Sequence, residues 1–197
     1  MAFPSIVLAS TSRYRRELLE RLRLPFDVSA SDINETALPS ESPRETAIRL
    51  AREKALTVAA RFPGAVVIGS DQTVDAGGES LGKPMTHAVA LAQLQLLQGR
   101  SAVFYTAVAV VGPSSGSVQQ DCVQTTVRFK RVATERLENY LRADQPYDCA
   151  GSAKIESLGI ALIDSVESSD PTALIGLPLI RLTSMLAAVG VDVLAQR

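Results

Sequence analysis

Two long β-rich runs constrain the fold of this 197-residue chain more than any other feature of its sequence. Residues 103–111 and 118–129 are rich in valine, threonine and aromatic side chains, which favour strands. The segment between them, residues 112–116, consists of glycine, proline and serine, which are typical turn residues, so we expect an antiparallel pair. Shorter apolar runs predict further strands at residues 6–9, 65–68 and 160–166.

Helical patterns alternate with these strands. Residues 42–45, Ser-Pro-Arg-Glu, form a capping box with proline at the first helical position, and Pro63-Gly64 should stop the helix that follows. Further helices are expected after Ser12 and over residues 86–99, 134–142 and 178–189. This order predicts an α/β fold with a mixed sheet flanked by helices. No repeat or linker is evident, so we expect residues 1–197 to form one domain.

Composition limits the classes of partner. The formal net charge of -1 gives no global basic field, so we expect no nucleic-acid partner. Cys122 and Cys149 are too far apart for a CxxC motif, and two cysteines suit a reducing cytoplasm. The first residues lack the pattern of a signal peptide. Apolar stretches such as residues 173–180 are shorter than the roughly 20 residues of a membrane span, so a cytoplasmic location without a membrane is expected.

The start of the first predicted helix is a candidate phosphate site. Residues 10–16 combine the hydroxyls of Ser10 and Ser12 with arginines that include Arg15, at the positive end of a helix dipole. Ser10 or Ser12 could equally be a simple N-cap beside a solvated arginine face. The sequence contains no GxxxxGK[ST] motif, so this is not a Walker loop.

Asp71 is the strongest single catalytic candidate. Its segment, residues 69–72, directly follows an apolar run, so we expect the carboxylate beyond the strand, at a sheet edge. There it could bind a hard cation or orient water, although a turn or cap aspartate is the commoner use of such a residue.

Other charged residues are ambiguous by themselves. Lys54 lies near the apolar stripe of its helix and either reaches into a cleft or snorkels to solvent. Lys83, between Gly82 and Pro84, either contacts phosphate or is a solvated loop residue. Residues 148–156 either close on a ligand or form a tight connection with exposed charges. His87 is the sole histidine, which leaves carboxylates, lysines, arginines and serines, a set suited to metal-assisted phosphoryl chemistry.

Several segments together resemble the Maf family of nucleotide pyrophosphatases. The resemblance covers nearly the whole chain and implies a fold similar to that of the inosine-triphosphate pyrophosphatases, with an elongated sheet and two lobes around a nucleotide cleft. It also implies a divalent cation, Mg or Mn, and a homodimer. The segments that carry it are residues 8–16, 69–72, 82–84, 149–152 and 176–179.

The resemblance assigns roles residue by residue. Asp71 matches the proton acceptor of the family, and Glu35 matches an acidic position that we assign, with Asp71, to metal or water. The phosphate-contacting positions are matched by Ser10, Ser12, Arg15, Lys54 and Lys83.

Two further features resemble the 7-methyl-GTP branch of the family. Gln72 and residues 152–156 differ from the dTTP and UTP form, which has threonine after the catalytic aspartate and Ala-Tyr at positions 152–153. A 7-methylguanine ring is positively charged and should stack on an electron-rich ring such as that of Tyr14, where this branch is expected to have tryptophan. Glu156 could accept hydrogen bonds from N1–H and N2–H of guanine.

The sequence therefore predicts hydrolysis of 7-methyl-GTP to 7-methyl-GMP and diphosphate, which removes a modified nucleotide from the pool. One alternative is the same reaction on dTTP and UTP or on non-canonical purine triphosphates. An alternative of another class is a nucleotide-binding regulator of septum formation that does not hydrolyse its ligand.

Overall fold

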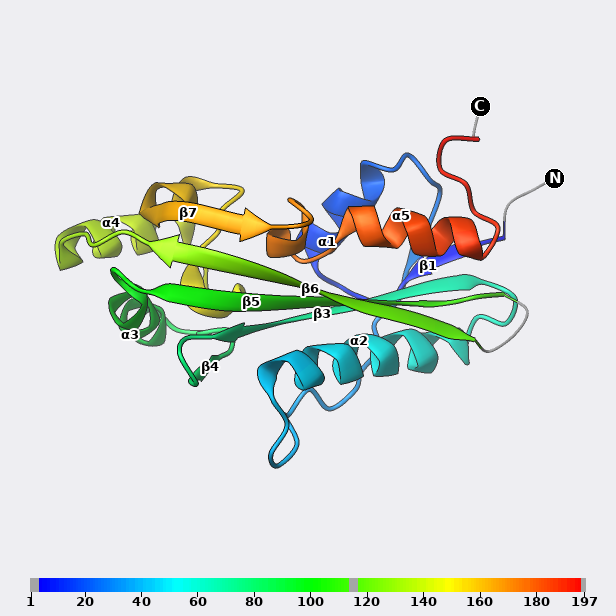
Figure 1. Ribbon diagram of the computed structural model, residues 1–197, viewed down its shortest axis with the longest axis horizontal. Helices are drawn as coiled ribbons and strands as arrows, with labels where there is room; N and C mark the ends of the chain where they lie inside the picture. The colour runs from blue at the N-terminus through cyan, green and yellow to red at the C-terminus, as the bar shows by residue number, and fades with distance from the viewer. Residues whose placement is uncertain (1–3, 114–116, 196–197) are drawn as a thin grey trace. The chain divides into compact units, whose positions relative to one another are not determined.

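The computed structural model describes residues 4–113 and 117–195 (Figure 1). The chain divides into two compact units. Unit 1 comprises Met1–Asp71, Thr106–Val123 and Asp170–Arg197, and unit 2 comprises Gln72–Tyr105 and Gln124–Ser169. The strands are β1 (Ile6–Leu8), β2 (Asp27–Val28), β3 (Val66–Asp75), β4 (Ser80–Leu81), β5 (Ser101–Val111), β6 (Val118–Phe129) and β7 (Ile163–Ser168). The α-helices are α1 (Arg13–Glu20), α2 (Pro43–Ala59), α3 (His87–Leu97), α4 (Thr134–Asp144) and α5 (Leu179–Ala188).

The strands pair in the order β2-β1-β3-β5-β6-β7, and β4 pairs with β3. Strand β1 is parallel to both β2 and β3, whereas β3–β4 and β6–β7 are antiparallel. Strands β3, β5 and β6 each contribute residues to both units. The predicted mixed sheet flanked by helices is therefore confirmed. That residues 1–197 form one domain remains a prediction.

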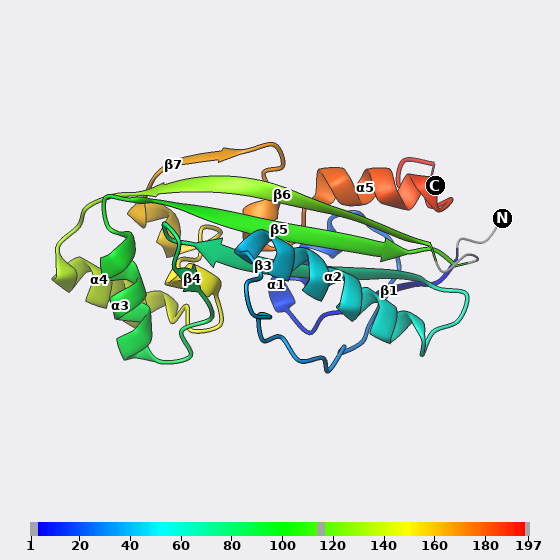
Figure 2. The ribbon, with the colours of Figure 1, turned by 60° about the horizontal axis from the view of Figure 1, so that its bottom comes forward.

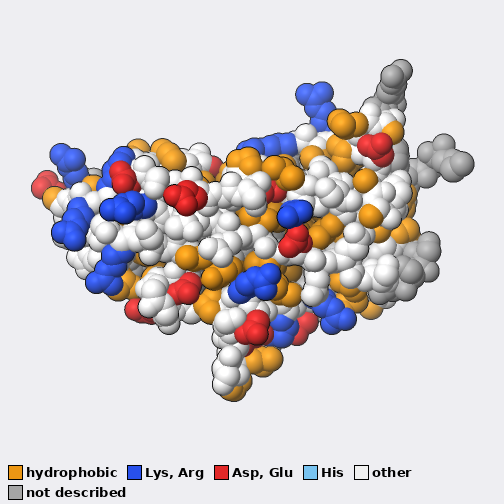
Figure 3. Space-filling view, viewed as in Figure 1, with side chains coloured by type: hydrophobic (Ala, Val, Ile, Leu, Met, Phe, Trp, Pro, Cys, Tyr) orange, Lys and Arg blue, Asp and Glu red, His pale blue; other side chains and the backbone are white. Residues whose placement is uncertain are grey.

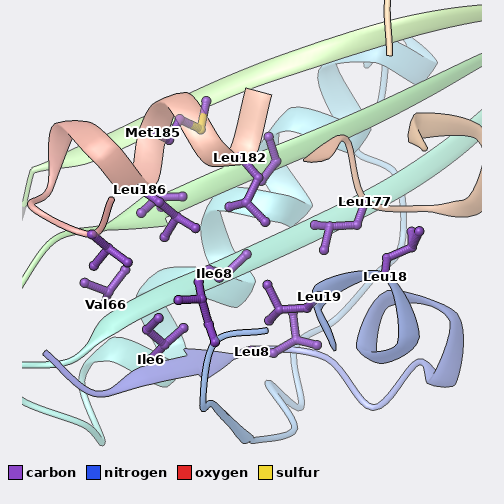
Figure 4. Packing of buried hydrophobic residues seen from close by; sticks show 14 residues of the cluster. Ile6, Leu8, Leu18, Leu19, Val66, Ile68, Leu177, Leu182, Met185 and Leu186 are labelled. Carbon is purple, nitrogen blue, oxygen red and sulfur yellow. The ribbon is translucent and has the colours of Figure 1, made fainter. Parts of the chain in front are cut away.

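The core of unit 1 lies between its strands and helices α1 and α5 (Figure 4). Because strand side chains alternate between two faces, Ile68 of β3 points to this core from the face that also carries Val66. Leu19 of α1 and Leu186 of α5 are fully buried there, and each such leucine contributes about 1.5–3 kcal/mol of burial free energy. These contacts fix α1, and with it the candidate phosphate site, on one face of the strands.

Helix α2 packs on the opposite face of β3. A Cβ atom at Gly69 would lie 2.2 Å from the carbonyl oxygen of Ala51, so only glycine permits this approach. The predicted capping box is confirmed: Ser42 Oγ accepts from Glu45 N at 3.3 Å, and Glu45 Oε2 accepts from Ser42 N at 2.8 Å. Strand alternation then directs Asp71 towards α2, two residues beyond Gly69.

Unit 2 is built around the remaining parts of the long strands. Val74 of β3 pairs with Leu81 of β4, and Val127 of β6 pairs with Val166 of β7. Helices α3 and α4 pack against each other beside these strands (Figure 2). Thr86 caps α3 by accepting from Val89 N at 3.3 Å, which places the preceding turn next to the helix start.

Two predicted boundaries were wrong. Strand β3 continues to Asp75 instead of ending at residue 68, so Asp71 lies inside the strand and not beyond it. Ser70 and Asp71 can lie buried within β3 because a carbonyl of β5 and the Lys54 side chain of α2 bind them. Strand β7 starts at Ile163, because Leu158–Leu162 form a 3₁₀ turn. Of the predicted turn at residues 112–116, residues 114–116 lie outside the described part.

Surface features agree with the composition. Figure 3 shows Lys and Arg side chains interspersed with Asp and Glu side chains on the face that it views, as expected for a net charge of -1. Within residues 4–113 and 117–195, no helix combines the length and the apolar character that crossing a membrane requires.

A carboxylate network holds the segment before α2. Glu41 accepts from Arg49 Nε at 2.7 Å and from Arg49 Nη2 at 2.8 Å, and also from Leu38 N and Thr46 Oγ1. The hydrogen bonds from Arg49 contribute most to lowering the pKa of Glu41, to about 2. Arg49 Nη2 also donates to the carbonyl of Thr36 at 3.1 Å, so this network orders the chain beside Glu35.

We expect the Glu41→Gln substitution to lower the free energy of unfolding by about 1–2 kcal/mol near neutral pH. The folded-state pKa of Glu41 is depressed, so its contribution is present above the unfolded pKa of about 4.5 and is lost as pH falls towards about 2. Urea unfolding at about pH 7 and about pH 3 should therefore show a smaller difference from wild type at the lower pH. A difference that grows on acidification would contradict this assignment.

Candidate active site

The start of α1 holds Arg15 in a defined position. Ser12 is the N-cap residue, and its Oγ accepts from Arg15 N at 3.5 Å. Ser10 Oγ accepts hydrogen bonds from Ser12 N at 3.2 Å and from Arg15 Nη1 at 3.4 Å. Arg15 Nε donates to the carbonyl of Gly176 at 3.0 Å. The structure therefore brings Ser10, Ser12 and Arg15 together and confirms the N-cap role of Ser12, whereas their contact with phosphate remains a prediction.

A buried lysine joins two carboxylates in the same unit. Lys54 Nζ of α2 lies 2.6 Å from Asp71 Oδ1 of β3 and 2.6 Å from Glu35 Oε1. The side chains of Lys54 and Asp71 are 6% and 9% exposed, whereas that of Glu35 is 52% exposed. Burial makes charge pairing essential for Lys54 and Asp71, and exposure leaves Glu35 accessible to a ligand.

Arg15 belongs to the same electrostatic group. Burial lowers the pKa of Arg15, and attraction to Asp71 and Glu35 opposes that effect. An arginine remains protonated at neutral pH, so the group contains two cations and two carboxylates. The opposite charges compensate one another, and the N-terminus of α1 adds a positive dipole end.

The carboxylates of Asp71 and Glu35 could bind a divalent cation only if the substrate supplies further ligands. Among the described residues, no three His, Cys, Asp or Glu side chains gather as a metal site. Asp71 and Glu35 nevertheless converge on one nitrogen, and Mg²⁺ is commonly bound through one or two carboxylates together with substrate phosphates. These residues therefore suit a shared metal and not an all-protein cage.

The loop before α5 supports Arg15, a role that the sequence reading did not assign. Ser70 Oγ lies 2.9 Å from the carbonyl of Gly176 and 2.8 Å from that of Ala107. Asp170 is 1% exposed and accepts from Thr172 N and from Ile180 N. The sequence carried a signal for this loop, because an aspartate followed by proline, as at Asp170-Pro171, favours the start of a turn.

Three further candidates lie in unit 2. Lys83 is exposed in the turn between β4 and α3, Gln72 is half-buried in β3, and Glu156 is exposed in the segment that follows α4. Lys154 is buried, and its Nζ donates to the carbonyl of Asp144 at 2.7 Å, so it anchors this segment to α4. Residues 148–156 thus form a tight connection, but the charge of Lys154 is buried and not exposed, and closure of the segment on a ligand remains a prediction.

Tyr14 is half-buried on α1 and already has a cation on its ring. The Arg13 guanidinium carbon lies 4.6 Å from the ring centroid, and Arg13 Nη2 donates to Tyr14 Oη at 2.6 Å. The ring face therefore attracts positive charge, as a cation–π interaction requires.

Comparison with known proteins places the chain in a family. The model of the family described as "Maf-like protein" matches residues 5–189. A protein of Albidiferax ferrireducens named 7-methyl-GTP pyrophosphatase is 54% identical over 189 residues, 96% of this chain and 95% of the relative. A protein of the same name from Polaromonas sp. is 57% identical over 192 residues, 98% of this chain and 88% of the relative. The structure of a HAM1 protein from Coxiella burnetii is similar with a TM-score of 0.46 and 21% identity, covering 66% of this chain and 75% of that one. The match over residues 5–189 and the identity to full-length relatives show that this chain belongs to the Maf family.

Proposed function

We propose that this chain is a nucleoside triphosphate pyrophosphatase that converts 7-methyl-GTP to 7-methyl-GMP and diphosphate in the cytoplasm. The observation that carries the proposal is the buried Lys54, which holds Asp71 and Glu35 at 2.6 Å each in a chain more than half identical to proteins named 7-methyl-GTP pyrophosphatase. Removal of the modified nucleotide from the pool is the expected consequence.

In the proposed reaction, Asp71 accepts a proton from the attacking water. The water oxygen forms a bond to phosphorus, the P–O bond of the α,β bridge breaks, and diphosphate leaves. Arg15 and Lys54 stabilise the negative charge that develops on the phosphoryl oxygens, and we assign the same role to Lys83. Ser10 and Ser12 position Arg15 and supply hydrogen-bonding groups for phosphate.

Asp71 and Glu35 would hold the divalent metal cation, Mg or Mn, together with the triphosphate. When bound, the ion would supply neutralisation of phosphate charge and a lower pKa for water. Lys54 keeps both carboxylates close together in the protein itself, which reduces the cost of bringing them to one ion. Manganese or magnesium removal with a chelator should abolish diphosphate release.

Selection of the base is assigned to Tyr14, Gln72 and Glu156. A 7-methylguanine ring carries positive charge, and the ring of Tyr14 binds the Arg13 cation at 4.6 Å, so it has the character required for such a base. Glu156 is exposed and provides two acceptor oxygens for the N1–H and N2–H donors of guanine.

The Glu156→Gln substitution should lower kcat/KM for 7-methyl-GTP by about 10-fold to 100-fold, because one charged acceptor is replaced by an amide with a single acceptor oxygen. The value for UTP should stay near wild type, since uracil lacks this pair of donors. Steady-state diphosphate release measures both. Glu135→Gln, an exposed glutamate on α4, is the matched control. Equal losses of kcat/KM for 7-methyl-GTP and UTP would contradict a contact between Glu156 and the base.

The test of the proposed function is diphosphate release by purified protein with magnesium or manganese, across 7-methyl-GTP, GTP, dTTP, UTP and ITP. Preference for 7-methyl-GTP supports it. Preference for dTTP, UTP or ITP would retain the enzyme class and overturn the base assignment. Binding of nucleotides without any release would overturn the enzyme and favour a regulator of septum formation. We further propose a homodimer, which sedimentation of the same sample would test.

A further inference from the structure

One buried side chain joins two segments of unit 2 that carry proposed substrate residues. The turn containing Lys83 begins at Gly82, and the segment containing Glu156 includes Ser152. Gln93 of α3 contacts both: its Nε2 donates to the carbonyl of Gly82 at 3.0 Å, and its Oε1 accepts from Ser152 Oγ at 2.6 Å. Gln93 thus forms a continuous hydrogen-bonded link between the two segments.

The chemistry of this link requires an amide. The Gly82 carbonyl can only accept, so position 93 must donate to it, while the Ser152 hydroxyl donates to an acceptor. Gln93 is 9% exposed and Ser152 is 0% exposed, so bulk water does not readily replace the bond between them, whereas the bond to Gly82 is part-buried. An isosteric side chain without polar atoms would leave both segments without their buried partner.

The backbone at Ser152 makes the link more important. Gly151 has φ 72° and Ser152 has φ 58°, and a left-handed conformation is unfavourable for serine. The hydrogen bond to Gln93 offsets that cost. Beyond Ser152, the chain is fixed again where Lys154 N donates to Tyr140 Oη at 2.9 Å. Glu156 therefore follows a segment that is held first by α3 and then by α4.

We propose that Gln93 is a positioning residue, which sets the turn of Lys83 and the segment of Glu156 in a fixed relation to each other. The inference rests on the proposed function, because Lys83 and Glu156 matter to catalysis only if they contact the triphosphate and the base. Gln93 itself touches no reacting atom. Its effect on selectivity comes through the two segments that it connects.

The first test compares Gln93→Met with Gln95→Met, an exposed position of the same helix. Hydrogen–deuterium exchange should accelerate in both residues 82–86 and 149–156 of Gln93→Met and in neither segment of the control. The ratio of kcat/KM for 7-methyl-GTP to that for UTP should fall about 10-fold, because Glu156 loses its fixed position. Ser152→Ala should loosen residues 149–156 alone and lower the same ratio.

The Gln93→Glu variant adds a measurement, the pH dependence of selectivity, that would not change if Gln93 only stabilised the fold. A protonated carboxylic acid can donate to Gly82 and accept from Ser152, whereas a carboxylate cannot donate. The selectivity ratio of this variant, relative to wild type at each pH, should therefore rise as pH falls. Faster exchange confined to α3, with an unchanged ratio in all three variants, would overturn the proposal. If wild type releases no diphosphate, the proposed function fails, and the exchange measurement alone still decides whether Gln93 links the two segments.

Discussion

The Asp71→Asn substitution is expected to lower kcat for 7-methyl-GTP by about 1,000-fold, the central value for loss of a general base. Asparagine has the same shape as aspartate and retains an oxygen that can accept from Lys54, which lies 2.6 Å away. It cannot take a proton from water. KM should change less than kcat, because the proposed contact of Arg15 with phosphate would remain. Steady-state diphosphate release with saturating metal measures both constants.

Asp75→Asn is the matched control for this experiment. Asp75 lies in the same strand, and its carboxylate accepts from Gly78 N at 2.6 Å, a bond that asparagine can also make. Thermal unfolding of both variants separates a loss of catalysis from a loss of structure. If folded Asp71→Asn turns over within a few-fold of wild type, Asp71 is not the base.

Local sequence signals were sufficient for most of the fold. The capping box at Ser42 and the N-cap at Thr86 define helix starts by contacts within three residues, so they can be identified without tertiary information. The apolar runs of β1 and β3 and the two long β-rich runs also form strands. These features depend on hydrophobic periodicity and turn chemistry, which the sequence displays directly.

The errors arose where distant residues satisfy polar groups. Residues 70–73 look like the end of a strand because they are polar, yet β3 continues through them to Asp75. Ser70 binds the carbonyls of Ala107 and Gly176, and Asp71 binds Lys54. None of these partners is within ten positions of β3 in the sequence, so no local pattern could reveal them.

The candidate site shows the same limit. The sequence offered a cleft or solvent for Lys54, and the structure excludes solvent by placing Lys54 in a buried ion pair with Asp71, supplemented by Glu35. Family resemblance identified these residues as a set, but it did not indicate that they contact one another. Gln93 gave no signal at all, because a glutamine on an amphipathic helix is usually exposed.

The second large effect is expected from Lys54→Met, which removes the cation but preserves the apolar stem. Asp71, 9% exposed, would then keep its charge without its closest partner. We expect the free energy of unfolding to fall by about 3 kcal/mol, the lower end of the range for breaking a buried pair, since Arg15 also attracts Asp71. Activity should fall on the order of 100-fold. Arg52→Met, on the exposed face of α2, is the control in denaturant unfolding and in the diphosphate assay.

The double variant Lys54→Met/Asp71→Asn distinguishes a charge effect from lost packing. Removing both partners eliminates the buried unpaired charge, so the double variant should be more stable than Lys54→Met alone, although each single change is destabilising. Its activity should remain as low as that of Asp71→Asn, because neither the base nor the cation is present. Stability losses that simply add would show that Lys54 and Asp71 are not coupled. A double variant more stable than Lys54→Met would mean that the two side chains are coupled, and that the instability of Lys54→Met comes from the unpaired charge of Asp71 rather than from lost packing.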